Sequence, residues 1–133
     1  GPNEWSYRRF ILHYAKLAAL AGGVDAFIIG SELRALTTAR DAPSSYPAVA
    51  ALKTLAGDVR AMLGATAKLT YAADWSEYGG HQPQDGTGDV HFHLDPLWSD
   101  ANIDAVGVDW YPPLTDWRDG AGHADAALAR DIY

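Results

Sequence analysis

Residues 24–32, VDAFIIGSE, contain the most apolar short run of the chain and indicate its architecture. Four apolar residues follow one another from Ala26 to Ile29, and the run ends in a carboxylate at Glu32. Short, nearly continuous apolar runs are typical of parallel strands that are covered on both faces. We therefore expect a strand over residues 24–30 that is buried on both faces and carries Glu32 at its carboxyl end.

An amphipathic helix is expected immediately before this strand. Between Trp5 and Ala21, apolar residues recur at the spacing of three and four that places them on one helical face. Asn3 is the expected N-cap, Glu4 suits the first turn, and Gly22-Gly23 is expected to end the helix.

The order of helix and strand is repeated farther along the chain. Residues 47–63 have helical periodicity and begin with Pro47, a residue suited to a first helical turn. Residues 68–73 and 103–108 have the pattern of further short strands, and a last helical pattern begins near His123. Alternating helices and buried strands indicate a right-handed parallel α/β arrangement.

Each predicted strand ends in an acidic residue, and the spacing of these acids indicates the size of the repeating unit. Glu32, Asp74 and Asp109 are separated by 42 and 35 positions. These intervals are somewhat longer than the roughly 31 residues per unit of an eightfold barrel. The excess fits the long loops after the first two strands, including the polar residues 76–89.

The expected fold class is α/β, a partial (β/α)8 TIM barrel with about three consecutive βα units. A complete barrel needs roughly 250 residues, and this chain has 133. Residues 1–133 are therefore expected to form a segment of a single domain. Such a segment exposes unpaired strand edges, which predicts self-association.

Composition excludes several classes of function. There are 10 Lys and Arg against 17 Asp and Glu, which gives a net charge of −7 and argues against a nucleic-acid partner. The chain has no cysteine, so thiolate metal sites are excluded, and no apolar run reaches the length of a membrane segment. The first residues lack a signal-peptide pattern. No phosphate-binding loop or nucleophile elbow is present, and no cofactor is expected.

The strand-end acids favour carbohydrate chemistry. Ligands of parallel α/β folds bind at the carboxyl ends of the strands. Trp75 and Trp110 directly follow two of the acids, and aromatic faces beside carboxylates suit sugar rings. For Asp74 and Asp109, capping of the following helix is an equally good interpretation. Glutamate is a poor N-cap, so Glu32 is the stronger candidate for chemistry.

His91 and His93 allow two interpretations. Alternate residues of a strand point the same way, so both imidazoles could meet one metal ion, with Asp95 nearby. The sequence offers no clear third and fourth ligands, so we expect these side chains to line a pocket and no metal to be bound. His81 and His123 are not expected to form a constellation with this pair.

Three motifs resemble those of a known family. They are residues 26–34 (AFIIGSELR), 69–78 (LTYAADWSEY) and 104–114 (DAVGVDWYPPL). In this order they resemble the TIM-barrel-like domain of gene transfer agent and phage tail proteins, large tail-hub proteins of phage-like particles from alphaproteobacteria. The resemblance runs from about Trp5 to Asp119. It implies a place in the tail of a virion-like particle assembled in the bacterial cytoplasm, with other tail or baseplate proteins as partners.

The domain is described as glycoside-hydrolase-like, and it is similar to retaining (β/α)8 glycosidases. In that clan a glutamate at the end of the fourth strand is the general acid/base, commonly preceded by asparagine. Glu32 matches this position, whereas Ser31 stands where the asparagine would be. The resemblance thus implies that the chain spans strands four to six. The nucleophile, a glutamate at the end of the seventh strand, would lie beyond Tyr133.

The expected function is glycan hydrolysis on a polysaccharide or peptidoglycan of the cell surface. The alternative is a non-catalytic glycan-binding or structural module of the tail tip. The expected catalytic residue is Glu32, and the expected substrate-binding residues are Ser31, Asp74, Trp75, Glu77, Tyr78, His91, His93, Asp109, Trp110 and Tyr111.

Overall fold

The structure, a computed structural model, describes residues 5–111 and 120–129. Three parallel strands form one sheet in the order β1-β2-β3, so the predicted α/β class with consecutive parallel strands is confirmed. In chain order the elements are α1 (Tyr7–Leu20), β1 (Ala26–Ser31), α2 (Arg34–Thr37), α3 (Pro47–Leu63), β2 (Lys68–Asp74), α4 (Trp75–Tyr78), α5 (Asp95–Trp98), β3 (Gly107–Asp109) and α6 (Ala124–Ala127).

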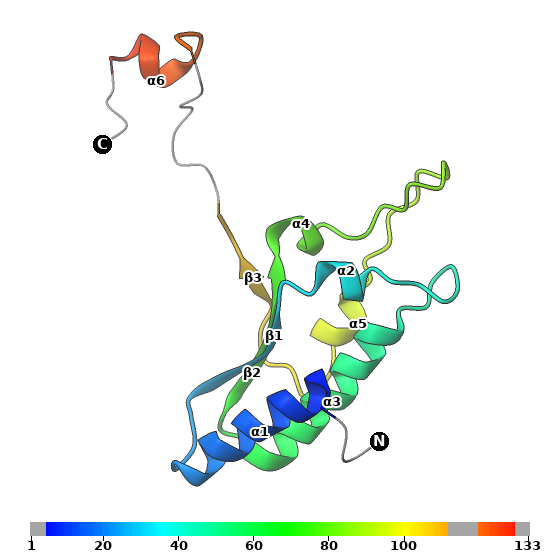
Figure 1. Cartoon of the computed structure of the whole chain (residues 1–133), viewed down its shortest axis with the longest axis vertical. Helices are drawn as coiled ribbons and strands as arrows, with labels where there is room; N and C mark the ends of the chain where they lie inside the picture. The colour runs from blue at the N-terminus through cyan, green and yellow to red at the C-terminus, as the bar shows by residue number, and fades with distance from the viewer. Residues whose placement is uncertain (1–4, 112–119, 130–133) are drawn as a thin grey trace.

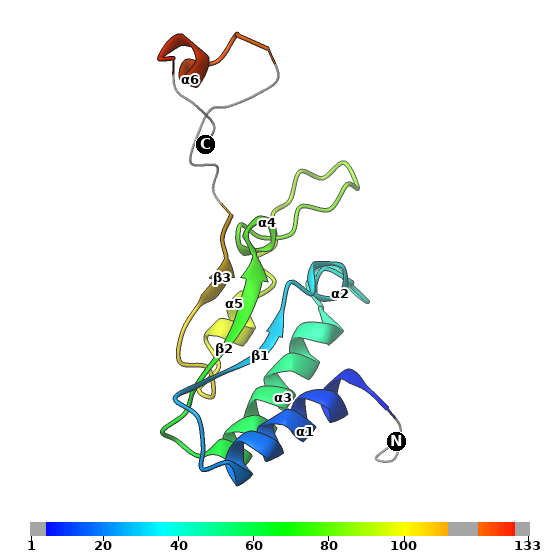
Figure 2. The same cartoon turned by 60° about the vertical axis from the view of Figure 1, so that its left-hand side comes forward.

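Helices α1 and α3 lie side by side on one face of the sheet (Figure 1, Figure 2). The expected range of α3 is confirmed: it starts at Pro47 and ends before Gly64, which has a φ of 78°. The expected cap of α1 is wrong. Ser6 is the N-cap, because its hydroxyl accepts a hydrogen bond from the Arg9 amide, and the helix begins only at Tyr7. Asn3 and Glu4 lie outside the described residues.

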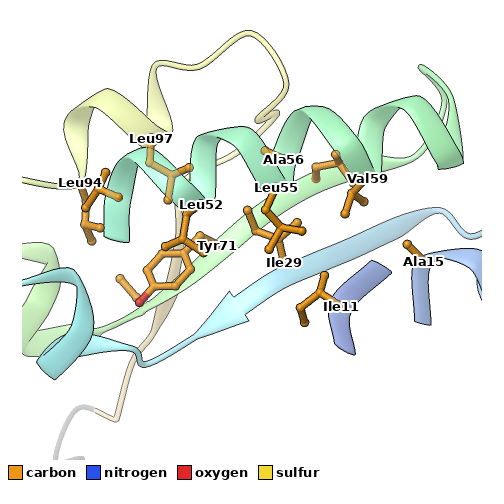
Figure 3. Close-up of a cluster of buried hydrophobic side chains, with 13 residues drawn as sticks. Ile11, Ala15, Ile29, Leu52, Leu55, Ala56, Val59, Tyr71, Leu94 and Leu97 are labelled. Atoms are coloured by element: carbon orange, nitrogen blue, oxygen red, sulfur yellow. The ribbon is translucent and has the colours of Figure 1, made fainter. Parts of the chain in front are cut away.

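The hydrophobic core lies between this helical layer and the sheet (Figure 3). The ring of Tyr71 from β2 is fully buried beside Leu52 and Leu55 of α3, and Ile29 of β1 packs against the same helix. Further core residues come from α1, α3, β2 and the α5 region: Ile11, Ala15, Val49, Ala56, Val59, Leu69, Ala73, Leu94 and Leu97.

The expectation that the strands are covered on both faces is wrong. Ile29 is fully buried against the helices, but its neighbour Ile28 is 54% exposed, as is Val106 beside β3. In a (β/α)8 barrel all helices lie outside the sheet, and the other face is the barrel interior. The apolar run of β1 therefore suits a strand with apolar groups against both faces. The described residues cover one of these faces.

Two glycines allow the backbone to approach other groups closely. A Cβ at Gly30 would lie 2.6 Å from the hydroxyl of Tyr7, which donates a hydrogen bond to the Ile29 carbonyl. A Cβ at Gly107 would lie 2.7 Å from the Tyr71 carbonyl oxygen, where β3 meets β2. Larger residues at these positions would push apart α1 and β1, or β2 and β3.

Strand β3 begins later than the sequence pattern predicts. The expected strand covered residues 103–108, but the strand starts at Gly107. Before it, one backbone hydrogen bond, from the Asp104 amide to the Leu69 carbonyl, and two bonds that involve side chains link this segment to β2. The Thr70 hydroxyl donates to the Ala105 carbonyl at 2.8 Å, and the Leu69 amide donates to the Asp104 carboxylate at 2.9 Å. No helix in the two described ranges is long and apolar enough to cross a bilayer.

Candidate functional site

The ends of β1 and β3 are linked across β2 by a hydrogen bond. The Ser31 hydroxyl donates to Oδ2 of Asp109 at 2.5 Å. Ser31 pairs in register with Ala72 of β2, and Asp109 pairs with Asp74. The carboxyl ends of all three strands therefore meet, as the positions of the acids predicted. We call Ser31, Glu32, Asp109 and the neighbouring Trp75 and Trp110 the strand-end site.

Glu32 occupies an unusual backbone conformation in this site. The register of β1 against β2 shifts between Ile28 and Ser31, and Glu32 then has a φ of 53°, in the left-handed region. Its amide still donates to the Ala72 carbonyl at 2.9 Å. The side chain is exposed, and its carboxylate accepts no hydrogen bond from the described residues. Glu32 is not a helix cap either, since Leu33 holds the N-cap position of α2.

Asp74 is a helix cap. Its carboxylate accepts hydrogen bonds from the amide of Ser76, at 2.8 Å, and from the hydroxyl of the same residue. The Glu77 side chain accepts in return from the Asp74 amide at 3.2 Å, which completes a capping box. These bonds, the Ser76 hydroxyl first, lower the pKa of Asp74 below its ordinary value. Of the two interpretations of Asp74, the structure supports helix capping.

Glu77, an expected substrate contact, lies inside the protein. It is 1% exposed, and its carboxylate accepts hydrogen bonds from the hydroxyls of Thr37 and Tyr71. The Tyr71 hydroxyl accepts in turn from the Leu33 amide at 2.9 Å. Burial and the nearby charge of Glu77 raise the pKa of Tyr71. Glu77 therefore connects α2, β2 and α4 from within, a role that its sequence position did not reveal.

The aromatic candidates form two groups. The rings of Trp75 and Trp110 lie edge to face with centroids 6.3 Å apart, and Tyr111 follows with 73% of its surface exposed. Tyr78 instead packs against Trp98, at 5.7 Å, on the wall of a separate cavity of about 680 Å³. Of these aromatic residues, Trp75 and Trp110 belong to the strand-end site as defined above, and Tyr111 follows it in the sequence.

His91 and His93 lie in a second cluster, and His81 joins them. Their three rings surround Tyr46, with centroid distances of 5.9 Å to His81, 6.2 Å to His91 and 5.3 Å to His93. The expectation that His81 stands apart from this pair is wrong, because paired backbone hydrogen bonds between His81 and His91 close the polar loop and bring both ends together. The only sequence signal was their position at the two ends of that loop.

Two histidines of this cluster, His81 and His93, have the features of packed, neutral side chains. Burial is the largest cause that lowers the pKa of both His81 and His93. Within the described residues, no set of three or more His, Asp or Glu side chains is arranged to hold a metal ion. The Nε2 atom of His93 is buried without a hydrogen-bond partner.

The comparisons with known proteins gave one match. A family model described as the GTA TIM-barrel-like domain matches residues 5–133. This range includes all three motifs on which the sequence resemblance rests. Neither a curated protein nor a solved structure matches the chain.

Proposed function

Since this chain belongs to the GTA TIM-barrel-like domain family, we propose that it serves in the tail of a gene transfer agent particle and hydrolyses a glycan there. The substrate is a polysaccharide or peptidoglycan of the recipient cell surface, and Glu32 is the general acid/base. The observation that carries the proposal is the hydrogen bond from Ser31 to Asp109, which draws β1 and β3 together beside Glu32.

The strand-end site has an acid for the leaving-group oxygen and aromatic faces for sugar rings, which glycoside hydrolysis needs on one side of the glycosidic bond. A general acid must reach the leaving-group oxygen of the sugar. The carboxylate of Glu32 is exposed and accepts no hydrogen bond from the described residues, so it is available for this contact. Trp75 and Trp110 are 53% and 59% exposed and offer apolar faces to sugar rings.

A second candidate function is glycan binding without cleavage. A retaining mechanism needs a second carboxyl group about 5–5.5 Å from the first. Asp74 and Asp109, the other acids at this edge, already accept hydrogen bonds from Ser76 and Ser31. Glycan binding, in contrast, needs only the exposed groups that Glu32, Trp75 and Trp110 supply.

The test compares the full chain with Glu32→Gln on purified peptidoglycan and on a panel of β-linked polysaccharides. New reducing ends and bound glycan are both measured. Asp25→Asn is the matched control. Asp25 is an exposed acid at the amino end of β1, whereas Glu32 follows the carboxyl end of the same strand.

Release that is lost in Glu32→Gln and kept in Asp25→Asn would support hydrolysis. Saturable binding in all three proteins without release would favour the binding function. If the protein neither binds nor cleaves any of these glycans, both candidate functions are contradicted.

A further inference from the structure

A polar pocket lies close to the strand-end site and has no part in the chemistry proposed above. Its volume is about 430 Å³, and it lies between α2 and the loop that follows α4. Arg34 and Thr38 line it from α2 and its C-cap, and His81, Gln82 and Gln84 line it from the loop. Arg34 comes two residues after Glu32 in the sequence, and Ser76 and Glu77, which follow Trp75, line the pocket as well.

Arg34 brings a guanidinium to the pocket, and its charge is among the causes that lower the pKa of the nearby Asp74. Arg8, Arg40 and Arg60 form ion pairs with Asp58, Asp85 and Asp104. Across residues 5–111 and 120–129, the guanidinium of Arg34 has no hydrogen bond and no ion pair. A planar guanidinium with unused donors is suited to hold a carboxylate through two parallel hydrogen bonds.

The other titratable groups around the pocket leave Arg34 as its cation. Glu77 contributes to the wall, but its carboxylate is buried and receives hydrogen bonds from Thr37, Tyr71 and the Asp74 amide. Burial and the charge of Arg40 lower the pKa of His81, so its ring is neutral near pH 7. With the Glu77 carboxylate in the wall and the Asp74 carboxylate near Arg34, this single positive charge suits a monoanion better than a phosphate dianion.

The remaining lining groups suit the hydroxyls of a sugar. The Thr38 hydroxyl donates to the Arg34 carbonyl at 2.7 Å, which leaves its oxygen able to accept. The side-chain amide of Gln84 donates to the backbone carbonyl of Gln82 at 3.3 Å, and both side chains keep further donors and acceptors. These neutral groups surround the guanidinium without neutralising it.

We infer that this pocket binds the carboxylate of an acidic sugar, with Arg34 as the anchoring residue. The inference rests on the proposed function for its setting and makes it more specific: the glycan carries carboxylates, as uronic-acid polymers do. A sugar held at Arg34 places the neighbouring unit of the chain toward Glu32.

The test measures binding of tetragalacturonate to the full chain by calorimetry, beside the same oligomer with its carboxyl groups reduced to alcohols. We expect the acidic oligomer to bind at least tenfold more tightly. Arg34→Gln should remove this preference. Arg34→Lys should keep only part of it, because lysine keeps the charge but lacks the two parallel donors of the guanidinium. Lys16→Gln, which removes an exposed charge on α1, is the matched control and should bind as the parent does.

Equal binding of the two oligomers, absence of binding, or equal behaviour of Arg34→Gln and Lys16→Gln would overturn the inference. Competition by inorganic phosphate as strong as that by glucuronate would also overturn it, since the pocket would then be a general anion site. Glu32→Gln should bind the acidic oligomer normally. If that variant binds through Arg34 while no protein releases reducing ends, the hydrolase proposal fails and the pocket assignment stands.

Discussion

The hydroxyl of Tyr71 lies 3.0 Å from both carboxylate oxygens of Glu77, although one residue belongs to β2 and the other to α4. The same hydroxyl accepts the Leu33 amide, so one phenol connects the end of β1 to the helix that follows β2. This buried contact therefore joins the segment that carries Glu32 to the helix that begins with Trp75.

Tyr71→Phe should lower the free energy of unfolding by about 1–3 kcal/mol. The phenyl ring fills the same space, but the Leu33 amide and the Glu77 carboxylate each lose a buried partner. Urea denaturation measures the change. Tyr14→Phe is the control, because Tyr14 is 50% exposed on α1 and should change stability by less than about 0.5 kcal/mol. Equal effects of the two variants would show that the buried phenol contributes no more than an exposed one.

Ser31→Ala should lower the free energy of unfolding by about 0.5–1.5 kcal/mol, the usual contribution of one hydrogen bond. The variant loses the link between β1 and β3, so amide hydrogen exchange of Asp109 should become faster than in the parent. Ser44→Ala, in an exposed loop, is the matched control. Unchanged exchange at Asp109 would mean that the pairing of β2 and β3 alone fixes this edge.

His93→Gln should weaken the dependence of stability on pH between 7 and 5. Burial lowers the pKa of His93 in the folded protein, whereas the unfolded chain titrates near 6.5. As the pH falls below that value, the unfolded state binds a proton that the folded state does not bind, so the free energy of unfolding declines. Urea denaturation across this range should show a shallower decline in the variant.

Some of that decline should persist in His93→Gln, because the pKa of His81 is lowered as well. Between pH 7 and 9 the difference between parent and variant should be constant. Parallel curves from pH 9 down to 5 would contradict the assignment of a neutral, buried His93.

Asp104→Asn should reduce the loss of stability in acid. Hydrogen bonds from the Leu69 amide and from Arg60 lower the pKa of Asp104 from 3.8 to about 2. A carboxylate with a lowered folded pKa stabilises the protein above its unfolded pKa, and this contribution is lost as the pH falls toward the folded value. The parent should therefore lose stability more steeply than the variant as the pH falls from 4 toward 2. Equal slopes would show that these contacts do not distinguish the folded state.

The features predicted correctly are those that short stretches of sequence specify. The range of α3 follows from its periodicity and from Pro47 and Gly64 at its ends. The positions of Glu32, Asp74 and Asp109 at one edge follow from the parallel order of the strands. Both properties depend on residues close together in the sequence or on a general rule of parallel sheets.

The errors concern features that depend on distant residues. Glu77 is buried because donors from Thr37 and Tyr71 meet it, and Thr37 lies 40 positions away. His81 joins His91 only through the backbone pairing that closes their loop. Exposure of Ile28 depends on which side of the sheet the helices occupy, and an apolar run cannot specify a side.

The left-handed backbone of Glu32 has a consequence for attempts to make this protein more thermostable. A residue with a Cβ costs about 1–2 kcal/mol in that conformation, and Glu32→Gly would relieve this at an entropic cost of about 0.5–1 kcal/mol. A screen for melting temperature alone would therefore tend to select glycine at position 32 and discard the one exposed carboxylate on which the proposed chemistry depends. Heat resistance and activity at this position call for different residues, so a stabilising library should hold Glu32 fixed.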